Sequence, residues 1–119
     1  MTLNFYPQPD GTPSYREEVR QFLIANPKIE CVCGGYNNLE FTKAGVTKGK
    51  ALKHLAELLS VSIEQTMAIG DTENDISILN TANIGVAMGN ATPEVKALSD
   101  YVTTSNEEDG VANALKLIK

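Results

Sequence analysis

The sequence predicts an α/β fold in which parallel strands are flanked by helices. From residue 46 onward, short apolar segments alternate with segments whose apolar residues recur at helical spacing, which is typical of βαβ units. The apolar segments are nearly continuous, as expected for parallel strands that are covered on both faces. Residues 1–45 instead predict a helix followed by a hairpin. We therefore expect two parts, residues 1–45 and residues 46–119.

In the first part, three prolines and a glycine predict an irregular first dozen residues. Ser14 is expected to cap a helix, with Glu17 completing a capping box. The apolar residues of this helix that recur at helical spacing are Val19, Phe22 and Leu23. Residues 28–33 and 39–42 then predict two antiparallel strands joined by a turn at residues 34–38.

In the second part, strands and helices are expected in alternation. They are a helix over 50–59, a helical turn from Ile63 capped by Ser62, a strand over 66–69, a helix that ends near Thr81, a strand over 84–88, a helix from Pro93 capped by Thr92, a strand over 101–103 and a helix over 110–119.

Composition limits the classes of function. The net charge is −5 and basic residues form no stripe, which argues against binding to the phosphate backbone of nucleic acid. No apolar run approaches the roughly 20 residues of a membrane span, and the N-terminus does not resemble a signal peptide, so we expect a cytoplasmic protein. Cys31 and Cys33 lack nearby histidines, which favours two reduced, partly buried thiols over a zinc site.

Polar side chains gather directly after the strand over 66–69, in Gly70-Asp71-Thr72-Glu73-Asn74-Asp75. Open α/β sheets bind ligands at the carboxyl ends of their strands. If a helix begins here, Asp71, Asn74 and Asp75 share one face near its N-terminus, where backbone N–H groups favour anions. A divalent cation together with a phosphate suits this arrangement, and oxygen ligands favour Mg²⁺. The alternative is that Asp71 only caps the helix.

Two further polar residues are candidates for the same site. Lys48 stands just before the helix over 50–59 and could neutralise phosphate charge, although a solvated lysine is the alternative. Asn90 follows the strand over 84–88 and either caps a turn or lines the same cleft. His54 lies within a helix, and we expect it to be a partly exposed helix residue.

The ordered motifs of residues 46–119 resemble the C-terminal half of a Cof-type phosphatase of the haloacid dehalogenase (HAD) superfamily. The segments that carry the resemblance are Lys48-Gly49, Ala68 to Asp75, Val86 to Ala91, Val95-Lys96, Asp100 to Val102 and Asp109 to Val111. The resemblance implies a partial Rossmann-like (HAD) core over 46–119. It also implies that residues 1–45 are a small helix-hairpin remnant of the α/β cap domain.

The resemblance also implies a chemistry, the Mg²⁺-dependent hydrolysis of a phosphate monoester, a small phosphorylated metabolite, through an aspartyl-phosphate. Lys48 and Asp75 would be catalytic, and Asp71 and Asp75 would serve the metal. Asp75 would do so by orienting a metal-bound water, or would pair with Lys48. The residues that would contact the phosphate are Lys48, Asn74 and Asn90.

The sequence departs from the family pattern at the nucleophile. The family carries an Asp-x-Asp pair on its first strand, and no such pair precedes residue 46. Asp10-Gly11-Thr12 resembles the end of that motif, but prolines precede it where an apolar strand should be. Covalent catalysis is then not available to the chain alone. We therefore expect at most weak metal and phosphate binding, with a non-catalytic binding or assembly module as the alternative.

The missing strand has a structural consequence. In the family fold it lies beside the strand over 66–69, so that strand should present an open apolar edge. Edges of this kind pair with something. We expect the edge to be covered by a second copy of the chain, by a complementary N-terminal half or by a rearranged local segment.

Overall fold

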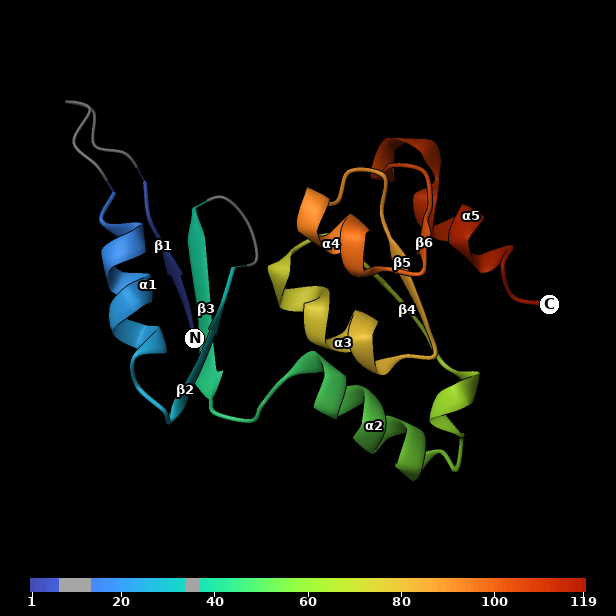
Figure 1. Cartoon of the computed structure of the whole chain (residues 1–119), viewed down its shortest axis with the longest axis horizontal. Coiled ribbons are helices and arrows are strands. Elements are labelled where there is room, and N and C mark those ends of the chain that lie inside the picture. Colours follow the sequence, from blue (N-terminus) through green and yellow to red (C-terminus); the bar gives the residue numbers. More distant parts are fainter. Residues whose placement is uncertain (7–13, 34–36) are drawn as a thin grey trace. The chain divides into compact units, whose positions relative to one another are not determined.

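A computed structural model describes residues 1–6, 14–33 and 37–119 (Figure 1). The chain divides into two compact units, Met1–Val46 and Thr47–Lys119. Each unit has its own three-stranded sheet. Within the described residues, no helix is long and apolar enough to cross a membrane.

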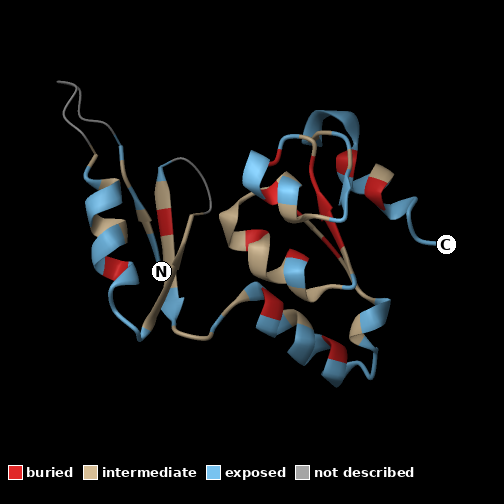
Figure 2. Ribbon diagram, in the orientation of Figure 1, coloured by how far each residue is buried: buried red, intermediate tan, exposed pale blue. Residues whose placement is uncertain are grey.

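In its described residues, the first unit is an antiparallel sheet with one helix. Its elements are β1 (Thr2–Asn4), α1 (Arg16–Ile24), β2 (Ile29–Val32) and β3 (Asn38–Lys43). The strand order is β1-β3-β2, and both pairings are antiparallel, which confirms the predicted hairpin of β2 and β3. Helix α1 packs against β2 and β3, and the buried apolar side chains of the unit are Leu23 of α1 and Leu39 of β3 (Figure 2).

Three expectations for this unit are wrong. The first residues are not all irregular, because Thr2–Asn4 pairs with β3. Ser14 does not cap α1; the N-cap is Tyr15, at φ 54° and without a side-chain cap bond. The start of α1 is instead connected to the sheet by the Arg16 side chain, which donates hydrogen bonds to Cys33 Sγ and to the Asn38 carbonyl. The predicted apolar set of the helix does not share one buried face, because Phe22 is 79% exposed whereas Leu23 is buried.

Other predictions for this unit hold or lie outside the described residues. Cys31 and Cys33 are partly buried and form no disulfide, as expected. The predicted turn falls largely on residues 34–36, and Asp10-Gly11-Thr12 falls within residues 7–13. Both of these segments lie outside the part of the chain that the structure describes.

The second unit contains the predicted parallel sheet. Its strands are β4 (Met67–Gly70), β5 (Ile84–Ala87) and β6 (Tyr101–Val102), in the order β4-β5-β6 with both pairings parallel. The α/β fold class with flanking helices is therefore confirmed. Because β4 and β5 pair in register, with Gly70 opposite Ala87, the two strands end side by side. The loops that follow them consequently emerge at the same edge of the sheet.

Helices flank this sheet and contribute to its core. They are α2 (Lys48–Leu58), α3 (Ile76–Thr81), α4 (Pro93–Leu98) and α5 (Gly110–Leu115), with three 3₁₀ turns, η1 (Ile63–Gln65), η2 (Glu73–Asp75) and η3 (Asn106–Glu108). Helix α3 packs against β4 and β5 as well as against α2. The buried core cluster comprises Ala68, Leu79, Ala87, Met88, Ala91 and Val95 (Figure 2).

Local signals explain several of these boundaries. Thr92 accepts a hydrogen bond from the Val95 N–H at 3.4 Å and Pro93 follows it, which confirms the predicted start of α4. Ser62 caps η1, as predicted, by accepting from the Glu64 N–H. Helix α5 ends at Leu115, earlier than the expected 119.

The second unit has a strand at the end of its sheet and several exposed apolar side chains. Strand β4 lies at the end of the sheet order, and among the described residues β5 is its only strand partner. In the C-terminal half of α2, Leu55 and Leu58 are exposed, as is Leu59 directly after the helix, with exposed fractions of 51%, 69% and 64%.

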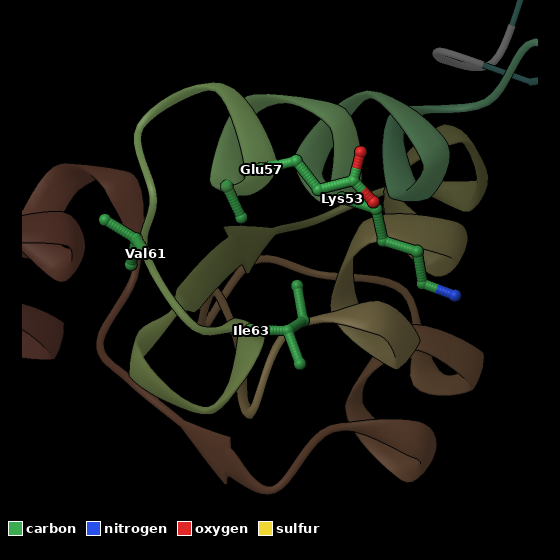
Figure 3. A pocket seen from close by; sticks show the side chains of 5 residues that line it. Lys53, Glu57, Val61 and Ile63 are labelled. Carbon is green, nitrogen blue, oxygen red and sulfur yellow. The ribbon is translucent and has the colours of Figure 1, made fainter.

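Between α2 and η1 lies a hollow of about 230 Å³ (Figure 3). It is lined by Lys53, Ala56, Glu57, Val61 and Ile63.

Candidate functional site

The turn after β4 places a carboxylate over the end of its own strand. A side chain at Gly70 would bring a Cβ within 2.5 Å of the Asp75 Cβ and 2.9 Å of Asp75 Oδ2. Glycine leaves this space open, and Asp75 folds back into it. Asp75 Oδ2 then accepts a hydrogen bond of 3.0 Å from the Asp71 N–H. The glycine that ends β4 is therefore required by the position of Asp75.

The other oxygen of Asp75 forms an ion pair with Lys48. Lys48 Nζ lies 2.5 Å from Asp75 Oδ1. The Asp75 side chain is 12% exposed, whereas that of Lys48 is 50% exposed. A nearly buried carboxylate is costly unless its charge is balanced and its oxygens accept hydrogen bonds. Asp75 meets both conditions, and the lysine keeps half of its surface open to solvent.

Close packing of two helix starts brings Lys48 to Asp75. Thr47 caps α2 by accepting from the Lys50 N–H, so Lys48 is the first helical residue. The Gly49 N–H donates to Ser77 Oγ at 3.1 Å. A Cβ at Gly49 would collide with the Ser77 carbonyl oxygen and lie 2.5 Å from Thr81 Oγ1. The absence of a side chain at this position lets α2 approach α3.

Asp71 is held by its backbone and by its side chain. Its N–H donates to Asp75 and its carbonyl accepts from the Thr92 N–H at 3.1 Å. Asp71 Oδ2 accepts from Asn90 Nδ2 at 3.4 Å. The N-cap position of η2 is Thr72, without a side-chain cap bond, so the alternative in which Asp71 only caps a helix is wrong. Its carboxylate contributes only Oδ2 to these contacts.

Asn74 is tied to the same turn. Thr72 Oγ1 donates to Asn74 Oδ1 at 2.7 Å. The expectation that Asp71, Asn74 and Asp75 share one face of an α-helix is wrong in its geometry. Asn74 and Asp75 lie in the 3₁₀ turn η2, and Asp71 precedes it. The hydrogen bond from Asp71 to Asp75, rather than helical spacing, brings the two acidic residues together.

Most of the predicted site residues thus lie in one connected cluster. Contacts run from Lys48 to Asp75, from Asp75 to Asp71 and from Asp71 to Asn90. Asn74 lies in the same turn but contacts Thr72. His54 is exposed on α2, as expected.

Sequence reasoning did not predict the supporting contacts of this cluster, which involve Gly49, Thr72, Ser77 and Asn106. A glycine within a helical pattern often has a packing reason, so Gly49 carried a usable signal. Asn106 is far from the cluster in the sequence, and no local pattern marks it.

The donor atoms of the cluster fit Mg²⁺ better than Zn²⁺. The described residues contain no group of three or more His, Cys, Asp or Glu side chains arranged to hold a metal. The carboxylates of Asp71 and Asp75 supply oxygen only, and Mg²⁺ commonly takes one or two carboxylates with water and substrate phosphate. Both oxygens of Asp75 are engaged by Lys48 and Asp71. Asp71 is therefore the better placed carboxylate to bind the ion directly.

Comparison of the sequence with known proteins gives consistent matches. A family described as haloacid dehalogenase-like hydrolase matches residues 9–115. The 5-amino-6-(5-phospho-D-ribitylamino)uracil phosphatase of Bacillus subtilis is 42% identical over 101 residues, which are 85% of this chain and 41% of that protein. A phosphoglycolate phosphatase of Methanothermobacter thermautotrophicus is 40% identical over 101 residues, 85% of this chain and 43% of that protein.

Solved structures agree with these matches. A haloacid dehalogenase-like hydrolase from B. subtilis superposes with a TM-score of 0.86 at 35% identity, covering 97% of this chain and 39% of that one. A sugar phosphatase of HAD subclass IIB superposes with a TM-score of 0.79 at 40% identity, covering 85% and 39%. The chain thus spans about two fifths of the length of these relatives.

Proposed function

Because the chain belongs to the haloacid dehalogenase-like hydrolase family, we propose that it carries the cation- and phosphate-binding half of a phosphate monoester hydrolase site. The observation that carries the proposal is the connected cluster of Lys48, Asp75 and Asp71 at the carboxyl end of β4. The half-exposed Lys48 ammonium and the Asp71 carboxylate, whose Oδ1 makes none of the cluster's hydrogen bonds, belong to this cluster, at the edge where open α/β sheets bind ligands.

Each residue has a distinct role in this proposal. Lys48 Nζ attracts the phosphoryl oxygens, and Asp75 holds that ammonium in place through their ion pair. Asp71 binds Mg²⁺, which when bound would neutralise charge on the phosphate. Asn74 contacts the phosphoryl group from the turn that follows Asp71, where the Thr72 hydroxyl fixes its side chain. Asp75 serves the metal indirectly, because both of its oxygens are already engaged.

The proposal stops at binding because the chain offers no attacking group of the family type. No Asp-x-Asp pair precedes residue 46. Loss of the nucleophile from a cooperative site costs many orders of magnitude in rate. The substrate class that the cluster supports is a small phosphorylated metabolite. The specific compounds in the names of the relatives are substrates of those proteins and are not assigned to this chain. We expect no more than weak turnover from the chain alone.

We further propose that β4 pairs with an apolar strand supplied by a complementary polypeptide. The edge residues Met67, Ala68 and Ile69 carry no charge, so nothing on the strand repels a partner. Leu55 and Leu58 of α2, and Leu59 directly after it, are also exposed, and the same polypeptide would bury them. The occupant we favour is the part of a relative that lies outside the matched residues, because the chain spans only about two fifths of such proteins.

Mixing experiments test this pairing. The chain and the unmatched part of the B. subtilis phosphatase, expressed separately, should form a 1:1 complex in analytical ultracentrifugation and gain Mg²⁺-dependent hydrolysis of an aryl phosphate. Leu58→Asp, at an exposed position, should weaken the complex while leaving the fold intact. A chain that remains a monodisperse monomer in the mixture would contradict the pairing, and dimerisation of the chain by itself would favour a second copy.

The alternative function is a binding or assembly module that uses the edge and not the polar cluster. It is favoured by one observation: the charges of Lys48 and Asp75 are already balanced by their ion pair, so they do not require a ligand. Thermal unfolding separates the two functions, because a ligand of the folded state must raise its stability. Ligand at ten times its dissociation constant should stabilise the chain by about 1.4 kcal/mol.

The stability experiment compares MgCl₂, inorganic phosphate and both together, with KCl at matched ionic strength. Asp71→Asn should abolish the Mg²⁺ effect while keeping the size of the side chain. Glu57→Gln removes the same charge from exposed α2, away from the cluster, and should leave the effect unchanged. No shift at tens of millimolar ligand in the unaltered chain would refute the binding function and favour the assembly module.

A further inference from the structure

We propose that Asn90 is a positioning residue for Asp71, rather than a direct contact of the phosphate, and that the backbone of Asn106 sets its orientation. Asn90 lies in the turn that follows β5. Its two amide atoms have different partners: Oδ1 accepts from the Asn106 N–H at 3.0 Å, and Nδ2 lies 3.4 Å from Asp71 Oδ2. The inference rests on the proposed role of Asp71 as the metal ligand.

The hydrogen bond from Asn106 decides which end of the amide faces Asp71. A side-chain amide has one acceptor branch and one donor branch. If the amide were rotated by 180°, its NH₂ group would face the Asn106 N–H, and its oxygen would face the Asp71 carboxylate. Both contacts would then be repulsive. The backbone donor of Asn106 therefore directs the Asn90 NH₂ group toward Asp71.

The segment that carries Asn106 is itself held firmly. The Gly89 N–H donates to the Thr104 carbonyl at 3.0 Å. A Cβ on Gly89 would lie 2.6 Å from the Ser105 nitrogen and 2.8 Å from the Thr104 carbonyl carbon. Glycine thus lets the segment before η3 approach the turn that carries Asn90. Ser105 and Glu108 close a capping box that fixes the start of η3.

Asp71 is consequently restrained by the loop that follows β5, and that loop is held by the segment at the start of η3. Its carbonyl accepts from Thr92, and its Oδ2 accepts from Asn90, both of which follow β5. Holding Oδ2 leaves Oδ1 as the oxygen that can bind a cation. Partners that orient a metal ligand typically change metal affinity by 10- to 100-fold when removed. The C-terminal segment therefore contributes to the metal site without touching the ion.

A pair of substitutions at residue 106 isolates the backbone donor. Asn106 is the first residue of η3, a position that accepts proline because its N–H makes no bond within the helix. Ser105, at φ −71° and ψ 170°, already has the extended conformation required before proline. Asn106→Pro removes the donor to Asn90, and Asn106→Ala keeps it. Asn90→Ala removes the bridging amide.

The experiment titrates MgCl₂ into the full ¹⁵N-labelled chain and follows the amide signals of Asp71 and Thr92. Asn90→Ala should weaken Mg²⁺ binding by about tenfold, Asn106→Pro by about three- to tenfold, and Asn106→Ala by less than about twofold. Unchanged chemical shifts across the sheet would show that each variant is folded. A parallel titration with inorganic phosphate alone should give the same affinity in all variants.

Three results would overturn the inference. Equal Mg²⁺ affinity in Asn106→Pro and Asn106→Ala would remove the role of the backbone donor, and unchanged affinity in Asn90→Ala would remove that of the amide. A loss of phosphate affinity without a loss of Mg²⁺ affinity in Asn90→Ala would make Asn90 a phosphate contact. If the unaltered chain binds no Mg²⁺, the metal role of Asp71 in the proposed function fails. The orientation is then tested by the Asn90 side-chain NH₂ signals, which must move in both Asp71→Ala and Asn106→Pro.

Discussion

Lys48 and Asp75 form an ion pair, with Nζ 2.5 Å from Oδ1, that joins the first turn of α2 to the residue before α3. The pair is asymmetric, because the lysine side chain is half exposed and the aspartate side chain is 12% exposed. The lysine can regain water when the pair breaks, but the aspartate cannot. The stability of this corner of the fold and the charge of the candidate site therefore depend on the same contact.

The first prediction follows from that asymmetry. Lys48→Met keeps most of the side chain but leaves the Asp75 charge nearly buried without a partner, so we expect a loss of about 1–3 kcal/mol in the free energy of unfolding. Lys50→Met, at an exposed position of the same helix, should change it by less than about 0.5 kcal/mol. Urea unfolding followed by circular dichroism measures both, because the chain contains no tryptophan. Equal values for the two variants would show that the pair adds nothing to stability.

The second prediction concerns whether replacing Gly49 by alanine raises or lowers the stability of the chain. Replacing glycine by alanine within a helix usually stabilises it by up to about 1 kcal/mol. Gly49→Ala should instead destabilise the chain by about 1–3 kcal/mol, because the new methyl group collides with the Ser77 carbonyl.

A double variant checks the cause of the Gly49 effect. Thr81→Ala removes the other close contact of the added methyl group but leaves the Ser77 backbone in place. The double variant should therefore remain destabilised. Full recovery in urea unfolding would show that the side chain of Thr81, and not the α3 backbone, limits the approach of α2.

The elements that the sequence predicted well are those whose signals are local. The near-continuous apolar runs that became β4 and β5 are typical of parallel strands, and their residues are all buried or partly buried. Thr92 and Pro93 marked the start of α4 because capping depends only on neighbouring residues. Asp71 and Lys48 could be named as candidates because each stands at the start or end of a regular element.

The features that could not be predicted depend on contacts between distant segments. Strand β1 has three residues, too few for a periodic pattern, and pairs with residues 38–40. Asp75 folds back over Gly70 because Lys48 and the Asp71 N–H both meet it there, which helical spacing does not foresee. The link from Asn90 to Asn106 spans 16 residues and joins a side chain to a backbone donor. A sequence pattern does not record such a bond.

The third prediction compares two leucines in different surroundings. Leu79 of α3 is 4% exposed and belongs to the core cluster, whereas Leu58 of α2 is 69% exposed. Leu79→Ala should cost about 2–5 kcal/mol, through lost burial and the cavity that remains. Leu58→Ala should cost less than about 0.5 kcal/mol in the isolated chain. Urea midpoints at an unchanged m-value give both numbers, and a large loss for Leu58→Ala would mean that this surface is already covered in solution.

The fourth prediction separates stability from metal binding at Thr92. Its hydroxyl caps α4, and its backbone N–H holds the Asp71 carbonyl at 3.1 Å. Thr92→Ala removes only the cap and should cost about 1 kcal/mol, whereas Thr92→Ser keeps the oxygen and should recover most of that loss. Neither change removes the N–H that positions Asp71, so Mg²⁺ affinity, measured from the Asp71 amide signal, should remain within about twofold of the unaltered chain, well below the tenfold loss typical of an orienting group. A tenfold weaker affinity in Thr92→Ala, recovered in Thr92→Ser, would show instead that the cap itself orders the loop that carries Asn90.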